Sequence, residues 1–170
     1  MENNRQKIRG EFRLADGEAT MLAGRLLAER LPETGPYPAI MLRGELGAGK
    51  TTFVRGLASA LPGGAEAEVS SPSFNIVNYY PTQPEMAHFD LYRLEHAAPE
   101  DELLESLECE NRLTVVEWVQ YLHAQHWPED HVEIELKRNG SGRALAVTLS
   151  RPSELAGKLL EALDRCFKRF

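Results

Sequence analysis

The stretch IMLRGELGAGKTTFVRG, residues 40–56, decides the fold because it joins three local signals in a fixed order. It begins with a short continuous apolar run, which is typical of a central strand covered on both faces. A glycine-rich loop follows, and then a helical repeat that places Phe53, Val54 and Leu57 on one face. This order of strand, loop and amphipathic helix predicts an α/β domain with a phosphate-binding loop after the strand.

The loop matches the pattern G-x-x-x-x-G-K-[ST] through Gly44, Gly49, Lys50 and Thr51. Glycines allow the backbone to curl so that successive N–H groups point at phosphate oxygens, and the helix start adds its positive dipole end. We expect Lys50 to span the β- and γ-phosphates of a nucleotide and the Thr51 hydroxyl to ligate Mg²⁺. The nucleotide-binding residues predicted in this stretch are Glu45, Leu46, Gly47, Ala48, Gly49, Lys50, Thr51 and Thr52.

Two acidic residues compete for the role of the second protein ligand of the metal. Glu117 ends the apolar run LTVVE, which suits a central parallel strand, so we predict that Glu117 is the metal ligand. Asp90 ends MAHF and is then a candidate to position the attacking water or a water of the metal shell. The alternative for Asp90 is a hydrogen-bonding residue that closes a strand. Trp118 is either ordinary core or an aromatic wall beside the nucleotide.

The remaining chain alternates strand and helix patterns, which predicts a single domain over residues 1–170. The fold class that we expect is a P-loop NTPase-like, three-layer α/β domain with a mixed, mostly parallel central sheet and helices on both faces. Strands are expected at residues 8–14, 39–42, 70–80, 86–94 and 113–118, helices at 16–31, 50–61, 98–110 and 153–167, and a hairpin at 131–150 around an Asn139-Gly140 turn.

Composition restricts the partners. The 170 residues are 42% hydrophobic and 26% charged. No apolar run approaches the roughly 20 residues that cross a bilayer, and the N-terminus has no apolar signal segment. We therefore expect a cytoplasmic protein. The net charge is -7, and the basic residues are scattered except in the tail, where the helix dipole accounts for Lys168 and Arg169. Strong direct binding to nucleic acid is therefore not expected.

The larger classes of phosphate-loop proteins do not fit. The Asn-Lys-x-Asp guanine clamp of GTPases does not occur, and Asp90 is followed by LYR and not by x-x-Gly. The segment after the first loop helix, GGAEAEVSSPSFNIV, has no arginine that could close over phosphates as in a small kinase. A minimal Mg²⁺-dependent ATPase with slow chemistry fits best. A small kinase acting on a metabolite or nucleoside, and a nucleotide-dependent binding module, stay open as alternatives.

Four segments, GELGAGKTTFVRGL, SSPSFNIVNYY, HFDLYRL and VVEW, occur in the order and approximate spacing of the TsaE family. The chain resembles this family, the small bacterial ATPases required to make threonylcarbamoyladenosine in tRNA, at least over residues 42–118. The resemblance implies that ATP and Mg²⁺ are bound, that hydrolysis is weak alone and stimulated by partners, and that the partners are the TsaB and TsaD proteins. TsaD, and not this chain, would perform the transfer.

The resemblance also assigns roles to residues. Lys50 and Thr51 would bind phosphate and Mg²⁺, Glu117 would be the second metal ligand, and Asp90 would be needed for hydrolysis. Trp118 would lie close to the site, residues 71–74 with Ser73 would sense the γ-phosphate, and residues 16–20 would approach the adenine. Two positions depart from the family pattern: Ser73 stands where threonine is frequent, and Val119 where proline is common.

Overall fold

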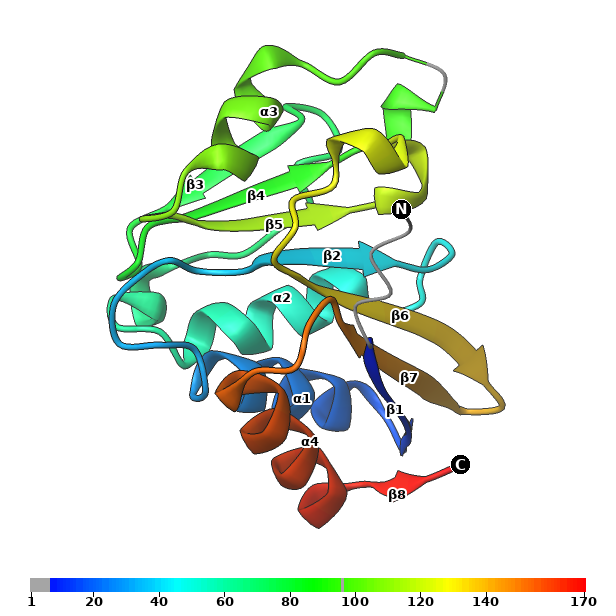
Figure 1. The fold of residues 1–170 in the computed structure, drawn as a ribbon. Coiled ribbons are helices and arrows are strands. Elements are labelled where there is room, and N and C mark those ends of the chain that lie inside the picture. Colours follow the sequence, from blue (N-terminus) through cyan, green and yellow to red (C-terminus); the bar gives the residue numbers. More distant parts are fainter. Residues whose placement is uncertain (1–6, 96) are drawn as a thin grey trace, which may run out of the picture.

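The computed structural model describes residues 7–95 and 97–170, so residues 1–6 and 96 of the predicted domain span lie outside the described residues. The fold is built on one mixed sheet with the strand order β3-β4-β5-β2-β6-β7-β1-β8 (Figure 1). Strands β4, β5, β2 and β6 pair in parallel, and the outer strands on both sides pair antiparallel. The strands are β1 (Ile8–Leu14), β2 (Ala39–Arg43), β3 (Val77–Tyr80), β4 (Met86–Asp90), β5 (Leu113–Glu117), β6 (His131–Asn139), β7 (Gly142–Leu149) and β8 (Lys168–Arg169).

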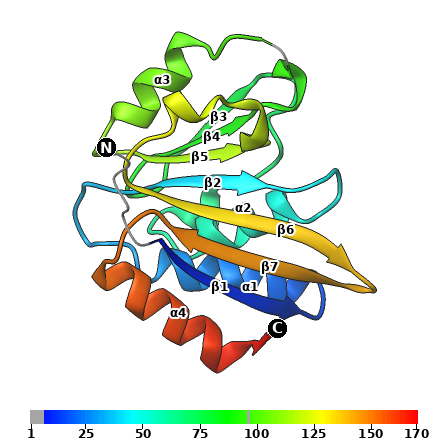
Figure 2. The same cartoon turned by 45° about the vertical axis from the view of Figure 1, so that its right-hand side comes forward.

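Helices cover both faces of this sheet (Figures 1 and 2). The longer helices α1 (Gly17–Ala28), α2 (Lys50–Ser59) and α4 (Glu154–Cys166) lie on one face and share a large apolar core with the strands. The other face is covered by α3 (Asp101–Glu108) and by short 3₁₀ turns, with a smaller core around Phe89, Leu103 and Val116. The predicted three-layer α/β class with a mixed sheet is therefore confirmed. The sheet is not mostly parallel, however, because three of its described strand pairs are parallel and four are antiparallel.

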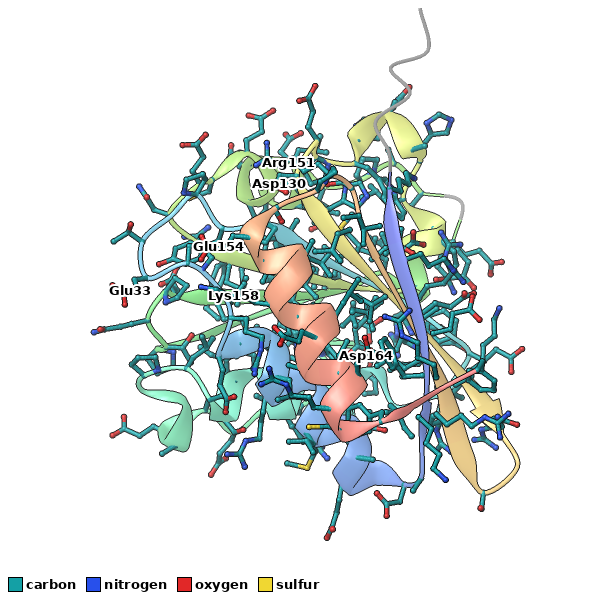
Figure 3. The ribbon with its side chains drawn as sticks, turned by 60° about the horizontal axis from the view of Figure 1, so that its bottom comes forward. Glu33, Asp130, Arg151, Glu154, Lys158 and Asp164 are labelled. Atoms are coloured by element: carbon teal, nitrogen blue, oxygen red, sulfur yellow. The ribbon has the colours of Figure 1, made fainter. Side chains whose placement is uncertain are left out.

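Several helix ends follow the sequence signals closely. The Asp16 carboxylate accepts a hydrogen bond from the Ala19 N–H and caps α1, and the Ser153 hydroxyl does the same for α4. Figure 3 looks onto α4 and shows Glu154, Lys158 and Asp164 along this helix. In the described ranges, every helix is too short or too polar to span a bilayer.

Helices α1 and α2 touch backbone to backbone. A Cβ atom at Gly24 would lie 2.2 Å from the Phe53 carbonyl oxygen, and one at Gly56 would lie 2.0 Å from the Met21 carbonyl oxygen. Only glycine leaves room for this approach. Because α2 begins directly at the glycine-rich loop, this contact fixes the position of the loop relative to α1.

Four predicted elements were partly wrong. The strand expected at residues 70–80 begins only at Val77, because residues 73–75 form a turn in which the Ile76 N–H donates to the Pro72 carbonyl. The strand expected at 86–94 ends at Asp90. Asn139 pairs with Gly142, which moves the hairpin turn one residue on, to Gly140 and Ser141. The tail residues 168 and 169 leave the helix and pair with β1 as the short strand β8.

Candidate functional site

The loop between β2 and α2 has the backbone conformation that the glycine pattern predicts. Gly47 and Gly49 have φ angles of 72° and 108°, a left-handed region that side chains with a Cβ rarely adopt. Gly49 is also the N-cap residue of α2, so the free N–H groups of the first helical turn face the loop. Thr20 of α1, in the segment that the resemblance places near the adenine, packs next to Gly49.

Lys50 is held inside this loop. Its Nζ donates hydrogen bonds to the carbonyl oxygens of Gly44 at 2.8 Å and of Glu45 at 2.9 Å, and it lies 3.9 Å from the ring centroid of Trp118. Burial lowers the pKa of Lys50, although the carboxylates of Glu117 and Asp90 partly raise it. Among the described residues, the hydrogen-bond partners of this buried ammonium group are two neutral carbonyl oxygens, which an anionic ligand would replace favourably.

The two candidate acids lie side by side at the carboxyl ends of the adjacent parallel strands β4 and β5, where Asp90 and Glu117 are register partners. The Glu117 Oε1 atom accepts a hydrogen bond from the Thr51 hydroxyl at 2.8 Å and contacts His88 Nε2 at 2.9 Å. The Asp90 carboxylate instead accepts from the Ser71 hydroxyl and, at 2.9 Å, from the Tyr92 N–H. Glu117 is thus hydrogen-bonded to Thr51 in the first turn of α2. Asp90 is hydrogen-bonded to Ser71, which begins the segment that folds back between Pro72 and Ile76 and is called the turn at residues 71–76 below.

A cavity of about 420 Å³ brings most of the predicted site residues together. Other cavities of about 370 Å³ and 570 Å³ exist elsewhere, so the residues of the glycine-rich loop in its lining, and not its volume, distinguish this one. Glu45 and Ala48 belong to the loop but do not line the cavity. The residues that do line it are Leu46, Gly47, Gly49, Lys50, Thr51, Thr52, Ser71, Ser73, Asp90, Tyr92, Glu117, Trp118 and Arg143.

Trp118 is both a core residue and a wall of the cavity. Its side chain is buried and packs against Tyr92 at 4.8 Å and parallel to Tyr121 at 5.8 Å between ring centroids. Its φ angle of 59° turns the chain sharply after β5. Val119, which stands where the family often has proline, then begins a 3₁₀ turn and is fully buried.

Sequence reasoning missed Arg143. This residue of β7 donates hydrogen bonds from Nε to the Ala48 carbonyl at 2.8 Å and from Nη2 to the Gly47 carbonyl at 3.3 Å. It therefore fixes two loop carbonyls from a position at the edge of the cavity that it lines. A single arginine in a hairpin carries no local signal for this role, because it depends on how the strands are ordered.

Thr51 and Glu117 fit a magnesium ion. Both offer the hard oxygen ligands that Mg²⁺ prefers, on side chains already joined by a hydrogen bond. No group of three or more His, Cys, Asp or Glu residues within the described ranges could hold a metal ion alone. Mg²⁺ usually takes one or two protein ligands and completes its shell with water and substrate phosphates.

The fold and the loop together define a class: a three-layer α/β protein of the P-loop NTPase-like type. Within it, a family model described as "Threonylcarbamoyl adenosine biosynthesis protein TsaE" matches residues 14–145, and the chain belongs to the TsaE family.

Similar proteins agree with this assignment. The chain is 36% identical over 131 residues to the tRNA threonylcarbamoyladenosine biosynthesis protein TsaE of Bacillus subtilis, covering 76% of this chain and 80% of the relative. It is 41% identical over 118 residues to the protein of the same name from Synechocystis, covering 66% and 71%. The crystal structure of Bacillus subtilis YdiB superimposes with a TM-score of 0.70 at 25% identity, covering 95% of this chain and 98% of that one.

Proposed function

We propose that the chain binds ATP with Mg²⁺, hydrolyses it slowly, and serves the synthesis of threonylcarbamoyladenosine in tRNA without performing the transfer itself. One observation carries this proposal: the family match spans residues 14–145 and includes the loop after which Thr51 is hydrogen-bonded to Glu117 and Lys50 lies over the Trp118 ring. The names of the matched relatives support the pathway, and the oxygen and nitrogen donors of the cavity support the nucleotide.

The residues of the cavity would share the work of hydrolysis. Loop N–H groups and the start of α2 would hold the phosphates, and Lys50 would exchange the Gly44 and Glu45 carbonyls for phosphate oxygens. Thr51 and Glu117 would hold Mg²⁺, which when bound neutralises charge on the phosphate oxygens. Asp90 would orient the water whose oxygen attacks the γ-phosphorus while the bond to the leaving ADP breaks.

The turn at residues 71–76 gives this site a route to sense its ligand. The Ser71 hydroxyl donates a hydrogen bond to Asp90, and Ser73 lines the same cavity. A γ-phosphate in the cavity would therefore contact the turn and Asp90 together. Phe74 in this turn is 82% exposed. A change in the turn would therefore reach the protein surface. We propose that TsaB and TsaD, in the cytoplasm, are the partners that respond to it.

The proposal is tested by depleting the protein in its host and measuring tRNA nucleosides by mass spectrometry. We expect threonylcarbamoyladenosine to fall and to return with the wild-type chain. Lys50→Ala should not restore it, because the phosphate cradle would lose its charge. Normal levels of the nucleoside after depletion would overturn the proposal.

A second measurement separates the ATPase from a small kinase. With labelled ATP, we expect the γ-phosphate to be released as inorganic phosphate. Its recovery on a metabolite or nucleoside would favour the kinase instead.

A further inference from the structure

His88 is a buried polar residue without an evident structural purpose. It lies in the middle of β4, is fully shielded from solvent, and is in register with Val115 of β5 and Asn78 of β3. Its Nε2 atom contacts Glu117 Oε1 at 2.9 Å. Among the described residues, His88 Nδ1 is the buried side-chain nitrogen or oxygen that lacks a hydrogen-bond partner. Such an atom is costly and calls for an explanation.

The contact with Glu117 decides which ring nitrogen carries the hydrogen. Glu117 Oε1 is an acceptor, so a bare Nε2 facing it would place two acceptors 2.9 Å apart. His88 therefore donates from Nε2–H and leaves Nδ1 as the atom without a partner. An apolar side chain at this position would avoid that cost, so what the imidazole adds to the molecule is one N–H donor aimed at Glu117.

Two donors converge on the same oxygen of Glu117. The Thr51 hydroxyl approaches Oε1 at 2.8 Å from α2, and His88 Nε2 approaches it at 2.9 Å from β4. Within the described ranges no donor pairs with the second oxygen, Oε2, although Glu117 lines the cavity. The two hydrogen bonds hold one carboxylate oxygen and leave the other available to a ligand.

We propose that His88 is a positioning residue for Mg²⁺: it fixes the Glu117 carboxylate so that a cation can bind beside Thr51. This inference rests on the proposed function, because it concerns the same metal. His88 acts through Glu117 and touches neither nucleotide nor metal. Hydrogen-bond partners of a metal-binding carboxylate change metal affinity by roughly 10–100-fold when they are removed.

The test compares His88→Leu, which removes the donor, with His88→Gln, which keeps an N–H donor at a similar reach. Binding of a non-hydrolysable ATP analogue is measured by calorimetry with EDTA and at increasing Mg²⁺ concentrations. In EDTA, we expect the affinity of His88→Leu for the ATP analogue to stay within about threefold of the wild type. The variant should need about 10–100 times more Mg²⁺ to reach half of the Mg²⁺-dependent gain in that affinity. His88→Gln should stay near the wild type.

Equal Mg²⁺ requirements for His88→Leu and the wild type would overturn the inference, as would the same loss in both variants. Thermal unfolding shows whether each variant folds, and His88→Met offers a more adaptable apolar replacement. If no variant folds, the inference is tested on the wild-type protein by an imidazole ¹⁵N–¹H spectrum. We expect the His88 Nε2–H signal to shift when Mg²⁺ is added to the nucleotide complex. An unchanged signal overturns the inference. A wild-type chain that shows no Mg²⁺-dependent binding would instead refute the proposed function.

Discussion

At Lys50, a positively charged group is enclosed by backbone carbonyls and an aromatic ring before any phosphate arrives. Burial lowers the pKa of this side chain below its ordinary value of 10.5. The folded protein then binds the proton less tightly than the unfolded chain, so this group makes folding stability rise with pH between the two pKa values. A phosphate favours the charged form and raises the pKa again.

We therefore predict that nucleotide binding at alkaline pH takes up a proton at Lys50 and weakens as pH rises. Calorimetry in two buffers of different ionisation enthalpy, at neutral and alkaline pH, measures this uptake. Lys50→Arg is the matched control, because arginine keeps its proton throughout this range. Equal proton uptake in Lys50→Arg and the wild type would assign the proton to another group.

Asp90 and Glu117 are neighbours in register, yet their hydrogen bonds assign them different roles. Asp90→Asn can keep the bond from the Tyr92 N–H but loses the charge that would orient water. We expect nucleotide affinity to change little while ATP turnover falls by about 10²–10⁴-fold, the usual contribution of a positioned general base. Binding assays and single-turnover kinetics measure the two quantities separately.

Glu117→Gln is the comparison for Asp90→Asn, and it should lose the Mg²⁺ dependence of nucleotide binding. If Asp90→Asn loses the response to Mg²⁺ and Glu117→Gln keeps it, the two roles must be exchanged.

Among the elements, the contact between α1 and α2 fixes the position of the loop. Gly24→Ala would place a methyl group 2.2 Å from the Phe53 carbonyl oxygen, so the helices must separate. We predict a loss of about 1–3 kcal/mol or more in the free energy of unfolding. Nucleotide affinity should weaken as well, because α2 carries Lys50 and Thr51 at its start. Chemical denaturation and calorimetry measure these effects.

Gly157→Ala in α4 is the matched control, since nothing lies within 4 Å of a Cβ atom there. It should stabilise the protein by up to about 1 kcal/mol through helix propensity and leave nucleotide binding unchanged. Equal effects of the two substitutions would show that helix propensity, and not the contact between α1 and α2, controls stability.

The sequence predictions were accurate where the interactions are local in the chain and failed where they join distant segments. The loop at residues 44–51 was predictable because its glycines, lysine and threonine act within one turn of chain. The turn at 71–76 was mistaken for strand because Ile76, Val77 and Tyr79 favour strands, whereas the Ile76 N–H bond to Pro72 closes a turn. The contacts of His88 and Arg143 depend on the order β4-β5-β2-β6-β7, which local patterns do not contain.

On the scale of the whole molecule, negative charge prevails and many of the basic side chains form ion pairs. The net charge is -7, and basic side chains are paired with acids around the surface, as in Arg43 with Glu133 and Arg112 with Glu85. On the face shown in Figure 3, Arg151 pairs with Asp130 and Lys158 with Glu154. Affinity for nucleic acid comes largely from cations that release the counterions of the phosphate backbone, so for an acidic chain weak binding of RNA stays a prediction.

This charge distribution, together with the proposed function, yields a prediction about what stimulates ATP hydrolysis. We expect ATP turnover by the chain alone to be slow, to stay unchanged when tRNA is added, and to rise when TsaB and TsaD are added together. Phosphate release is measured at low salt, where any electrostatic binding of tRNA is strongest. Lys50→Ala, mixed with the same partners, is the control for contaminating ATPases. Stimulation by tRNA alone would show that the chain binds RNA despite its acidic composition. A rate unchanged by the partners would exclude TsaB and TsaD as proteins that control ATP hydrolysis by this chain.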